Sequence, residues 1–149
     1  LVYASESGTG NDIVITEADV KNLIRAKAAI FAGIMTMLHQ MQLKIDDIKK
    51  IYVAGGFGRH LNISDSISIG MLPDLPEDKF EYVGNTSLQG ALMALLDQDA
   101  INKAENIADM TTYLELSLGN TFMEEFVSAL FIPHTDLSLF SRSQKLPDS

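Results

Sequence analysis

The chain has 149 residues, of which 46% are apolar, and its 20 acidic and 11 basic residues give a formal charge of −9. This length suits a single domain with a hydrophobic core. The absence of cysteine excludes a disulfide framework, a thiol nucleophile and any thiolate-bound zinc or iron–sulfur cluster. The acidic balance disfavours nucleic acid as a partner and favours a basic protein.

The first fifteen residues predict a hairpin, with apolar strands at 1–4 and 13–15 around a Gly/Ser-rich turn. They lack the basic and long apolar regions of a signal peptide. Apolar stretches elsewhere are too short to span a membrane, so we expect a cytoplasmic protein without membrane association. A chain that opens inside a strand indicates a piece of a longer polypeptide.

A long amphipathic helix is predicted from Thr16 to about Met41. Thr16 and Asp19 form a capping-box pattern, and acidic residues occupy the first turn, where the helix dipole favours them. Lys27 falls on the apolar face, where its ammonium must reach solvent, find a counter-charge or meet a ligand. The face is defined by Val20, Leu23, Ile24, Phe31, Ile34, Met35 and Leu38.

The middle of the chain alternates helices and strands, which predicts an α/β fold. A buried strand at 51–54 ends in Gly55-Gly56-Phe57-Gly58, where the backbone can approach a ligand closely, although glycines also serve plain turns. After a short helix capped by Ser64, a second strand at 80–83 ends in Gly84-Asn85. Thr86 or Ser87 then caps a helix to about Leu96, in which Gly90-Ala91 offers a small packing face.

Beyond Asp97 the pattern predicts a helix at 101–110, a strand at 113–116 and a last helix capped by Asn120. Pro133 closes that helix, and the polar residues that follow predict a loosely held segment. We therefore assign 1–133 to the folded domain and 134–149 to a C-terminal tail.

Several chemistries find no support in the sequence. The three histidines are scattered without a second ligand at helical spacing, which disfavours a transition-metal site. No Gly-x-Ser-x-Gly elbow, P-loop or dinucleotide fingerprint occurs, so nucleophilic hydrolysis and Walker-type binding are disfavoured.

Two motifs carry a resemblance. The run 51–58, Ile-Tyr-Val-Ala-Gly-Gly-Phe-Gly, resembles the adenosine motif of the acetate and sugar kinase, heat-shock chaperone and actin superfamily. The run 82–91, Tyr-Val-Gly-Asn-Thr-Ser-Leu-Gln-Gly-Ala, resembles its second connecting motif. Together with 16–20 and 26–30, these runs resemble the C-terminal domain of the ATP-dependent reductive activators of corrinoid proteins.

The resemblance implies a ribonuclease-H-like, actin-like ATPase subdomain, a mixed sheet flanked by helices, that contributes the adenine and ribose side of an ATP site. Its nucleotide-binding residues would be Gly55, Gly56, Phe57, Gly58 and Lys27. The subdomain-connecting residues would be Gly84, Asn85, Gly90 and Ala91.

The resemblance also implies cofactors and partners outside the chain. The full protein would use ATP or ADP with Mg²⁺, and a [2Fe–2S] cluster would lie in another domain, because this chain has no cysteine. Its partner would be a corrinoid protein, such as a corrinoid iron–sulfur protein or a methyltransferase subunit, with a homodimer as a further option. No nucleic acid, membrane or dedicated metal site is implied.

The superfamily's phosphate loops and catalytic acids are missing from these residues. We therefore expect a C-terminal fragment without catalytic residues, inactive alone but part of an ATPase that returns cob(II)alamin to cob(I)alamin. The alternatives are an activator of 2-hydroxyacyl-CoA dehydratases, a small-molecule kinase of the same superfamily, and a non-catalytic interaction module. The last is suggested by 13 acidic residues against two lysines in 61–140.

Overall fold

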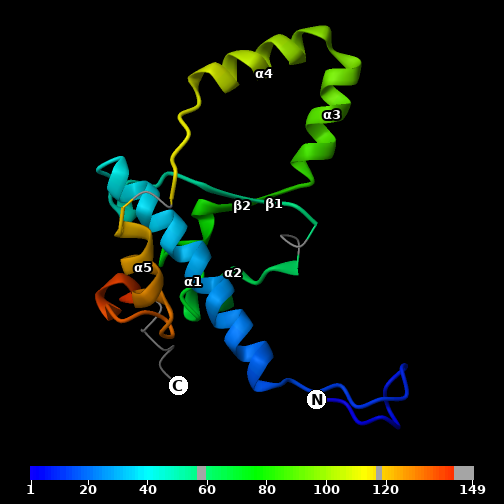
Figure 1. Cartoon of the computed structure of the whole chain (residues 1–149). Helices are drawn as coiled ribbons and strands as arrows, with labels where there is room; N and C mark the ends of the chain where they lie inside the picture. The colour runs from blue at the N-terminus through cyan, green and yellow to red at the C-terminus, as the bar shows by residue number, and fades with distance from the viewer. Residues whose placement is uncertain (57–59, 117–118, 143–149) are drawn as a thin grey trace.

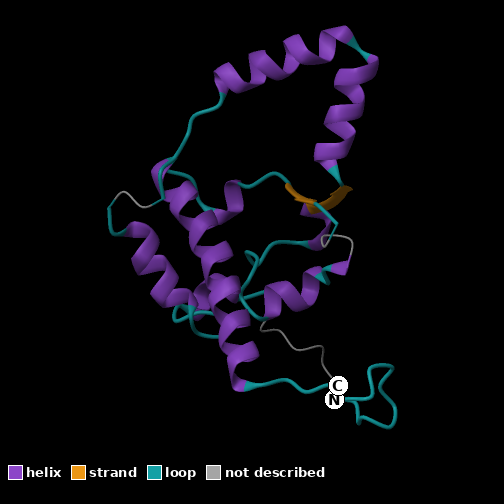
Figure 2. Cartoon of the chain, turned by 45° about the vertical axis from the view of Figure 1, so that its right-hand side comes forward, coloured by secondary structure: helices purple, strands orange, loops and turns teal. Residues whose placement is uncertain are grey.

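The computed structural model describes residues 1–56, 60–116 and 119–142. Helices outnumber strands in the described residues, and the strands form one small sheet that lies between the α3–α4 pair and the other helices (Figure 2). In chain order the helices and strands are α1 (Glu17–Gln40), β1 (Ile51–Ala54), α2 (Ile63–Ser68), β2 (Phe80–Gly84), α3 (Thr86–Leu96), α4 (Gln98–Met110) and α5 (Thr121–Ala129).

The hydrophobic core lies along the second half of α1, which packs against α5 (Figure 1). Phe31 is fully buried there, and side chains from α2 join the same cluster. The capping box predicted at the start of α1 is present, with the Asp19 amide donating to Thr16 Oγ1 at 3.2 Å. Val20 and Leu23 were predicted to be buried but are exposed, because the core covers only the later turns of α1.

The sheet consists of β1 and β2, paired in parallel with Ile51 opposite Phe80 and Ala54 opposite Gly84. Parallel pairing needs a crossover between the strands, and the segment with α2 supplies it. Both strands therefore end at the same edge of the sheet.

Residues 134–142 differ from the loose segment predicted after Pro133. The Phe140 ring is fully buried and lies 5.4 Å from that of Phe31, and the His134 ring lies 5.2 Å from Phe31. Burial lowers the pKa of His134, whose Nδ1 accepts the Asp136 amide at 3.0 Å. Two aromatic rings thus bring this segment into the core despite its polar composition.

Other local predictions shift or fail. Asn62 and Asn85, rather than Ser64 and Thr86 or Ser87, cap the helices that follow them, since each amide oxygen accepts a backbone N–H three residues on. The strand predicted at 113–116 is irregular backbone. The N-terminal hairpin is reduced to one antiparallel bridge, between Val2 and Ile13.

Candidate functional site

Two glycine turns lie side by side where the parallel strands end. Gly55 follows β1 and Gly84 closes β2, and the Gly55 amide donates to the Gly84 carbonyl oxygen at 2.7 Å. The carboxyl ends of parallel strands are where α/β sheets place ligands. The structure therefore brings Gly55 and Gly56 together with Gly84 and Asn85, four residues that the sequence singled out.

The backbone at this edge adopts conformations that favour glycine. Gly55 has φ +94° and Gly84 has φ +69°, both in the left-handed region. A Cβ built on Gly55 or Gly56 would meet no atom of the described chain within 4 Å. The first turn thus leaves space against its backbone, and a ligand could occupy it.

Asn85 has a structural task in this arrangement. Its side-chain oxygen accepts the Leu88 amide at 3.0 Å and so begins α3 directly after the second glycine turn. Gly90 and Ala91 lie on α3, where both are exposed, and a Cβ on Gly90 would meet nothing described within 4 Å. The small packing face predicted for them has no partner among the described residues.

Lys27 has partners other than those foreseen. Its side chain is buried, 1% exposed, and its ammonium donates to the carbonyl oxygens of Phe131 and, at 2.7 Å, Pro133. Burial lowers the pKa of Lys27 to about 8. The inward orientation that the sequence predicted is present, but the polar contacts connect α1 to the chain after α5 rather than to the glycine turns.

Phe57 and Gly58, the remaining predicted nucleotide-binding residues, lie outside the described residues.

A pocket that the sequence did not predict lies where the chain resumes after the first turn. Its volume is about 390 Å³, within the range of small-molecule sites. The Tyr82 hydroxyl donates to the Leu61 carbonyl oxygen and so ties β2 to this wall. In the sequence, Tyr82 stood out only as the first residue of the run 82–91, next to the second glycine turn. The lining residues are His60, Leu61, Asn62, Ile63, Ser64, Glu77, Phe80 and Tyr82.

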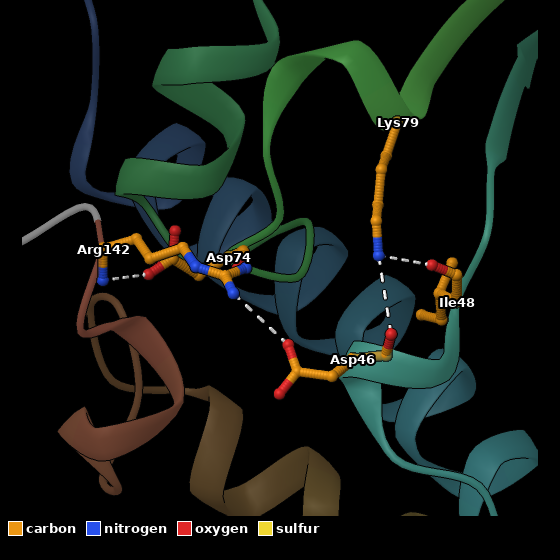
Figure 3. Close-up of polar contacts among 5 residues, drawn as sticks. All are labelled: Asp46, Ile48, Asp74, Lys79 and Arg142. Atoms are coloured by element: carbon orange, nitrogen blue, oxygen red, sulfur yellow. Dashed lines mark hydrogen bonds and ion pairs between the residues drawn. The ribbon is translucent and has the colours of Figure 1, made fainter.

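A polar cluster near the amino ends of the strands fixes their starting points (Figure 3). The Lys79 ammonium, just before β2, donates to the Ile48 carbonyl oxygen at 2.6 Å, close to the start of β1. Arg142 donates through its amide to the Asp74 carboxylate at 2.6 Å and lies 3.4 Å from the Asp46 carboxylate. These contacts tie the segments before β1 and β2 to each other and to the segment after α5, on the side of the sheet away from the glycine turns.

Within 1–56, 60–116 and 119–142, no three His, Cys, Asp or Glu side chains are grouped so that they could hold a metal ion. In the same described parts of the chain, no helix has both the length and the apolar character needed to cross a bilayer.

Comparison with known proteins gives consistent matches. The family model described as the C-terminal domain of RACo, the ASKHA domain, matches residues 1–144. The chain is 32% identical over 127 residues to the corrinoid activation enzyme RamQ of Eubacterium limosum, covering 85% of this chain and 21% of that protein. It is 29% identical over 123 residues to the [Co(II) methylated amine-specific corrinoid protein] reductase of Methanosarcina barkeri, covering 81% of this chain and 23% of that protein.

Among solved structures, a reductive activator for corrinoid, iron–sulfur protein matches with a TM-score of 0.89 and 60% identity, over 95% of this chain and 22% of that one. The chain thus spans about a fifth of the length of the relatives it matches.

Proposed function

Because the chain belongs to the family of C-terminal ASKHA domains of RACo-type reductive activators, we propose that it is the nucleotide-binding C-terminal part of an ATP-dependent activator of a corrinoid protein. In this proposal the whole activator returns cob(II)alamin to cob(I)alamin in the cytoplasm. Family membership also confirms the actin-like α/β fold class that the sequence predicted.

The paired glycine turns carry this proposal. The space in front of Gly55 and Gly56 suits the flat face of a nucleoside, because a side chain at either position would project into it. We assign the nucleoside wall to these two glycines, continued by Phe57 and Gly58. Lys27 is not assigned a nucleotide contact, because two carbonyl groups already enclose its ammonium.

The second glycine turn, Gly84-Asn85, connects the nucleoside wall to α3. The Gly84 carbonyl accepts from Gly55, and Asn85 caps α3 directly afterwards, so a displacement of the first turn reaches the helix through two hydrogen bonds. α3 carries no charged residue, and apolar side chains such as Leu95 are exposed on it. Exposed apolar surface of this extent is typical of a helix that packs against a partner. We propose that α3, with Gly90 and Ala91, joins this subdomain to the rest of the activator.

The remaining parts of the proposed reaction lie outside these residues. The chain has no cysteine to hold a [2Fe–2S] cluster, and among its described residues no three His, Asp or Glu side chains are grouped so that they could hold a metal ion. Bound ATP with Mg²⁺ would supply the free energy for an uphill electron transfer. This chain's own contribution is to hold the nucleoside and to pass nucleotide-dependent movement to α3.

A thermal-shift titration of the activator polypeptide with ATP and ADP tests nucleotide binding. Gly56→Val places a branched side chain in open space without a positive φ, so the fold is retained while the nucleoside face is blocked. Gly8→Val is the matched control, because Gly8 also faces open space in a distant turn. At ten times the Kd, the unfolding transition of this domain, taken as a cooperative unit of about 150 residues, should rise by roughly 3–6 °C in the parent and in Gly8→Val.

Gly56→Val should show no gain at the same ATP concentration. An equal gain in all three proteins would contradict the assigned site. The redox role is tested separately by following cob(II)alamin reduction, and equal rates with and without ATP would contradict it.

A further inference from the structure

Residues 134–142 form a strap that follows α5 and packs back on the core. The buried Phe140 ring in this strap lies 5.4 Å from that of Phe31 on α1. At the far end of the strap, the Arg142 amide donates to the Asp74 carboxylate at 2.6 Å (Figure 3). The strap therefore connects the core to the segment that leads into β2.

His134 begins the strap inside the core. The residue is 6% exposed, and its ring lies 5.2 Å from Phe31 and 6.3 Å from Phe140. Its Nδ1 accepts the Asp136 amide at 3.0 Å, so the proton of the neutral imidazole is on Nε2. Nε2 is buried and has no hydrogen-bond partner among residues 1–56, 60–116 and 119–142. The docked strap thus holds His134 as one neutral tautomer.

A protonated ring does not fit this position. The second ring proton would occupy Nδ1, toward which the Asp136 N–H already points, so protonation breaks the hydrogen bond that shapes the start of the strap. The imidazolium would also keep its Nε2 proton buried without a described acceptor. An unpaired buried donor is costly, and a buried charge is more so.

Charged groups face the His134 ring from α1, α5 and the strap itself. Lys27 on α1 donates to the carbonyl oxygen of the preceding residue at 2.7 Å, and its ammonium opposes a second positive charge. Glu125 on α5 and Asp136 on the strap favour that charge, and Glu125 also lies 3.5 Å from His39. Burial is the largest influence, and it keeps the pKa of His134 below its ordinary value of 6.5.

We propose that the strap is an acid-released latch: a proton taken up by His134 expels the ring from the core, and residues 134–142 leave with it. Release uncovers Phe31 and removes the contact of Arg142 with Asp74, so the segment before β2 loses one of its ties. The proposal concerns contacts within the chain and does not depend on the assignment of the nucleotide site.

The direction of the pH effect follows from proton uptake on release. Free His134 has its ordinary pKa of 6.5 and docked His134 a lower one, so release binds a proton and becomes more favourable as the pH falls. Lys27, with a pKa of about 8 in the docked state, is mostly protonated in both states at pH 7 and below. The acid dependence therefore belongs to His134. From pH 7.0 to 5.5 the ratio of released to docked strap should rise roughly two- to eightfold.

Hydrogen exchange of the activator polypeptide at pH 7.0 and 5.5, corrected for intrinsic exchange rates, measures this ratio at the Asp136 and Arg142 amides. His134→Phe keeps a ring but cannot be protonated, so its ratio should be equal at both pH values. His134→Asn also cannot be protonated, and it keeps an acceptor for the amide two residues on. His60→Phe is the matched control, because His60 is exposed outside the strap and its loss should preserve the rise.

Three results would overturn the proposal. Equal ratios at both pH values in the parent would show that acid does not release the strap. A rise in both His134 variants as large as in the parent would assign the effect to another group. A rise of the same size in the second half of α1 would show that acid unfolds the core instead of releasing the strap. No nucleotide is present in these measurements, so failure of the nucleotide site leaves them unaffected.

Discussion

The core around α1 and the arm of α3 and α4 are both rich in apolar side chains, but only the core buries them. Phe31 and Phe140 are fully buried, whereas Leu95 on α3 is 81% exposed. The core residues find one another within the chain, so they specify the fold. Under the proposed function, the arm and the adjoining glycine turns present surfaces that other molecules complete, so the chain divides into a stabilising core and an interacting edge.

The largest expected loss of unfolding free energy comes from a core substitution, set against a similar substitution on α3. Phe31→Ala removes a ring that packs on His134 and Phe140, and it should lower the free energy of unfolding by about 3–5 kcal/mol. Leu95→Ala should change it by less than about 0.5 kcal/mol in the 149-residue chain. Urea denaturation of both variants measures this, and similar losses would show that the arm is packed.

Two glycines, one in the core and one at the edge of the sheet, allow a second comparison of the two regions. Gly70 and Gly84 have φ of +76° and +69°, but a Cβ on Gly70 would lie 2.0 Å from the Pro133 carbonyl oxygen, while one on Gly84 meets only a side-chain atom, at 3.9 Å. Gly84→Ala should cost about 1–2 kcal/mol of backbone strain. Gly70→Ala should cost more than this, because backbone has to move in the core. Equal losses of unfolding free energy in urea would refute the contrast.

Lys27 supports the core through two carbonyl groups. Lys27→Met leaves both buried oxygens without this donor and should lower the unfolding free energy by about 1–3 kcal/mol at pH 7. Burial holds the pKa at about 8 in the folded chain, against an ordinary value of 10.5. Between these pH values the unfolded chain binds more protons, so the parent's stability should rise with pH relative to the variant. Parallel pH profiles for the two proteins would show that Lys27 titrates normally.

The smallest expected loss of unfolding free energy comes from the Asn85 cap at the edge of the sheet. Asn85→Ala removes the cap of α3 and should lower the unfolding free energy by about 1 kcal/mol. Asn85→Asp keeps an acceptor and should restore most of the loss. If both variants behave alike in urea denaturation, the cap does not hold α3 in place.

Features set by neighbouring residues were predicted from the sequence. The capping box of Thr16 and Asp19, the two strands and their glycine ends depend on contacts within a few positions, and each is found where the pattern placed it. The adjacency of the two turns follows from the parallel pairing of β1 and β2, which the mixed sheet predicted from the sequence did not specify.

Features set by distant residues were not predicted. The oxygens that hold Lys27 lie 104 and 106 positions away, and no local pattern marks them. Residues 134–142 are polar on average, yet Phe140 decides their position by filling space beside Phe31. The exposure of Val20 and Leu23 depends on where the core ends along α1, which helical periodicity does not encode.

Hydrogen exchange of the activator polypeptide with and without ATP tests the central claim most directly. The account predicts slower exchange in β1, the two glycine turns and the first turn of α3, with no change in the second half of α1 or in α5. Protection centred on Lys27 and its partners, or no ATP-dependent protection at Gly55 and Gly84, would contradict the division between a stabilising core and an interacting edge.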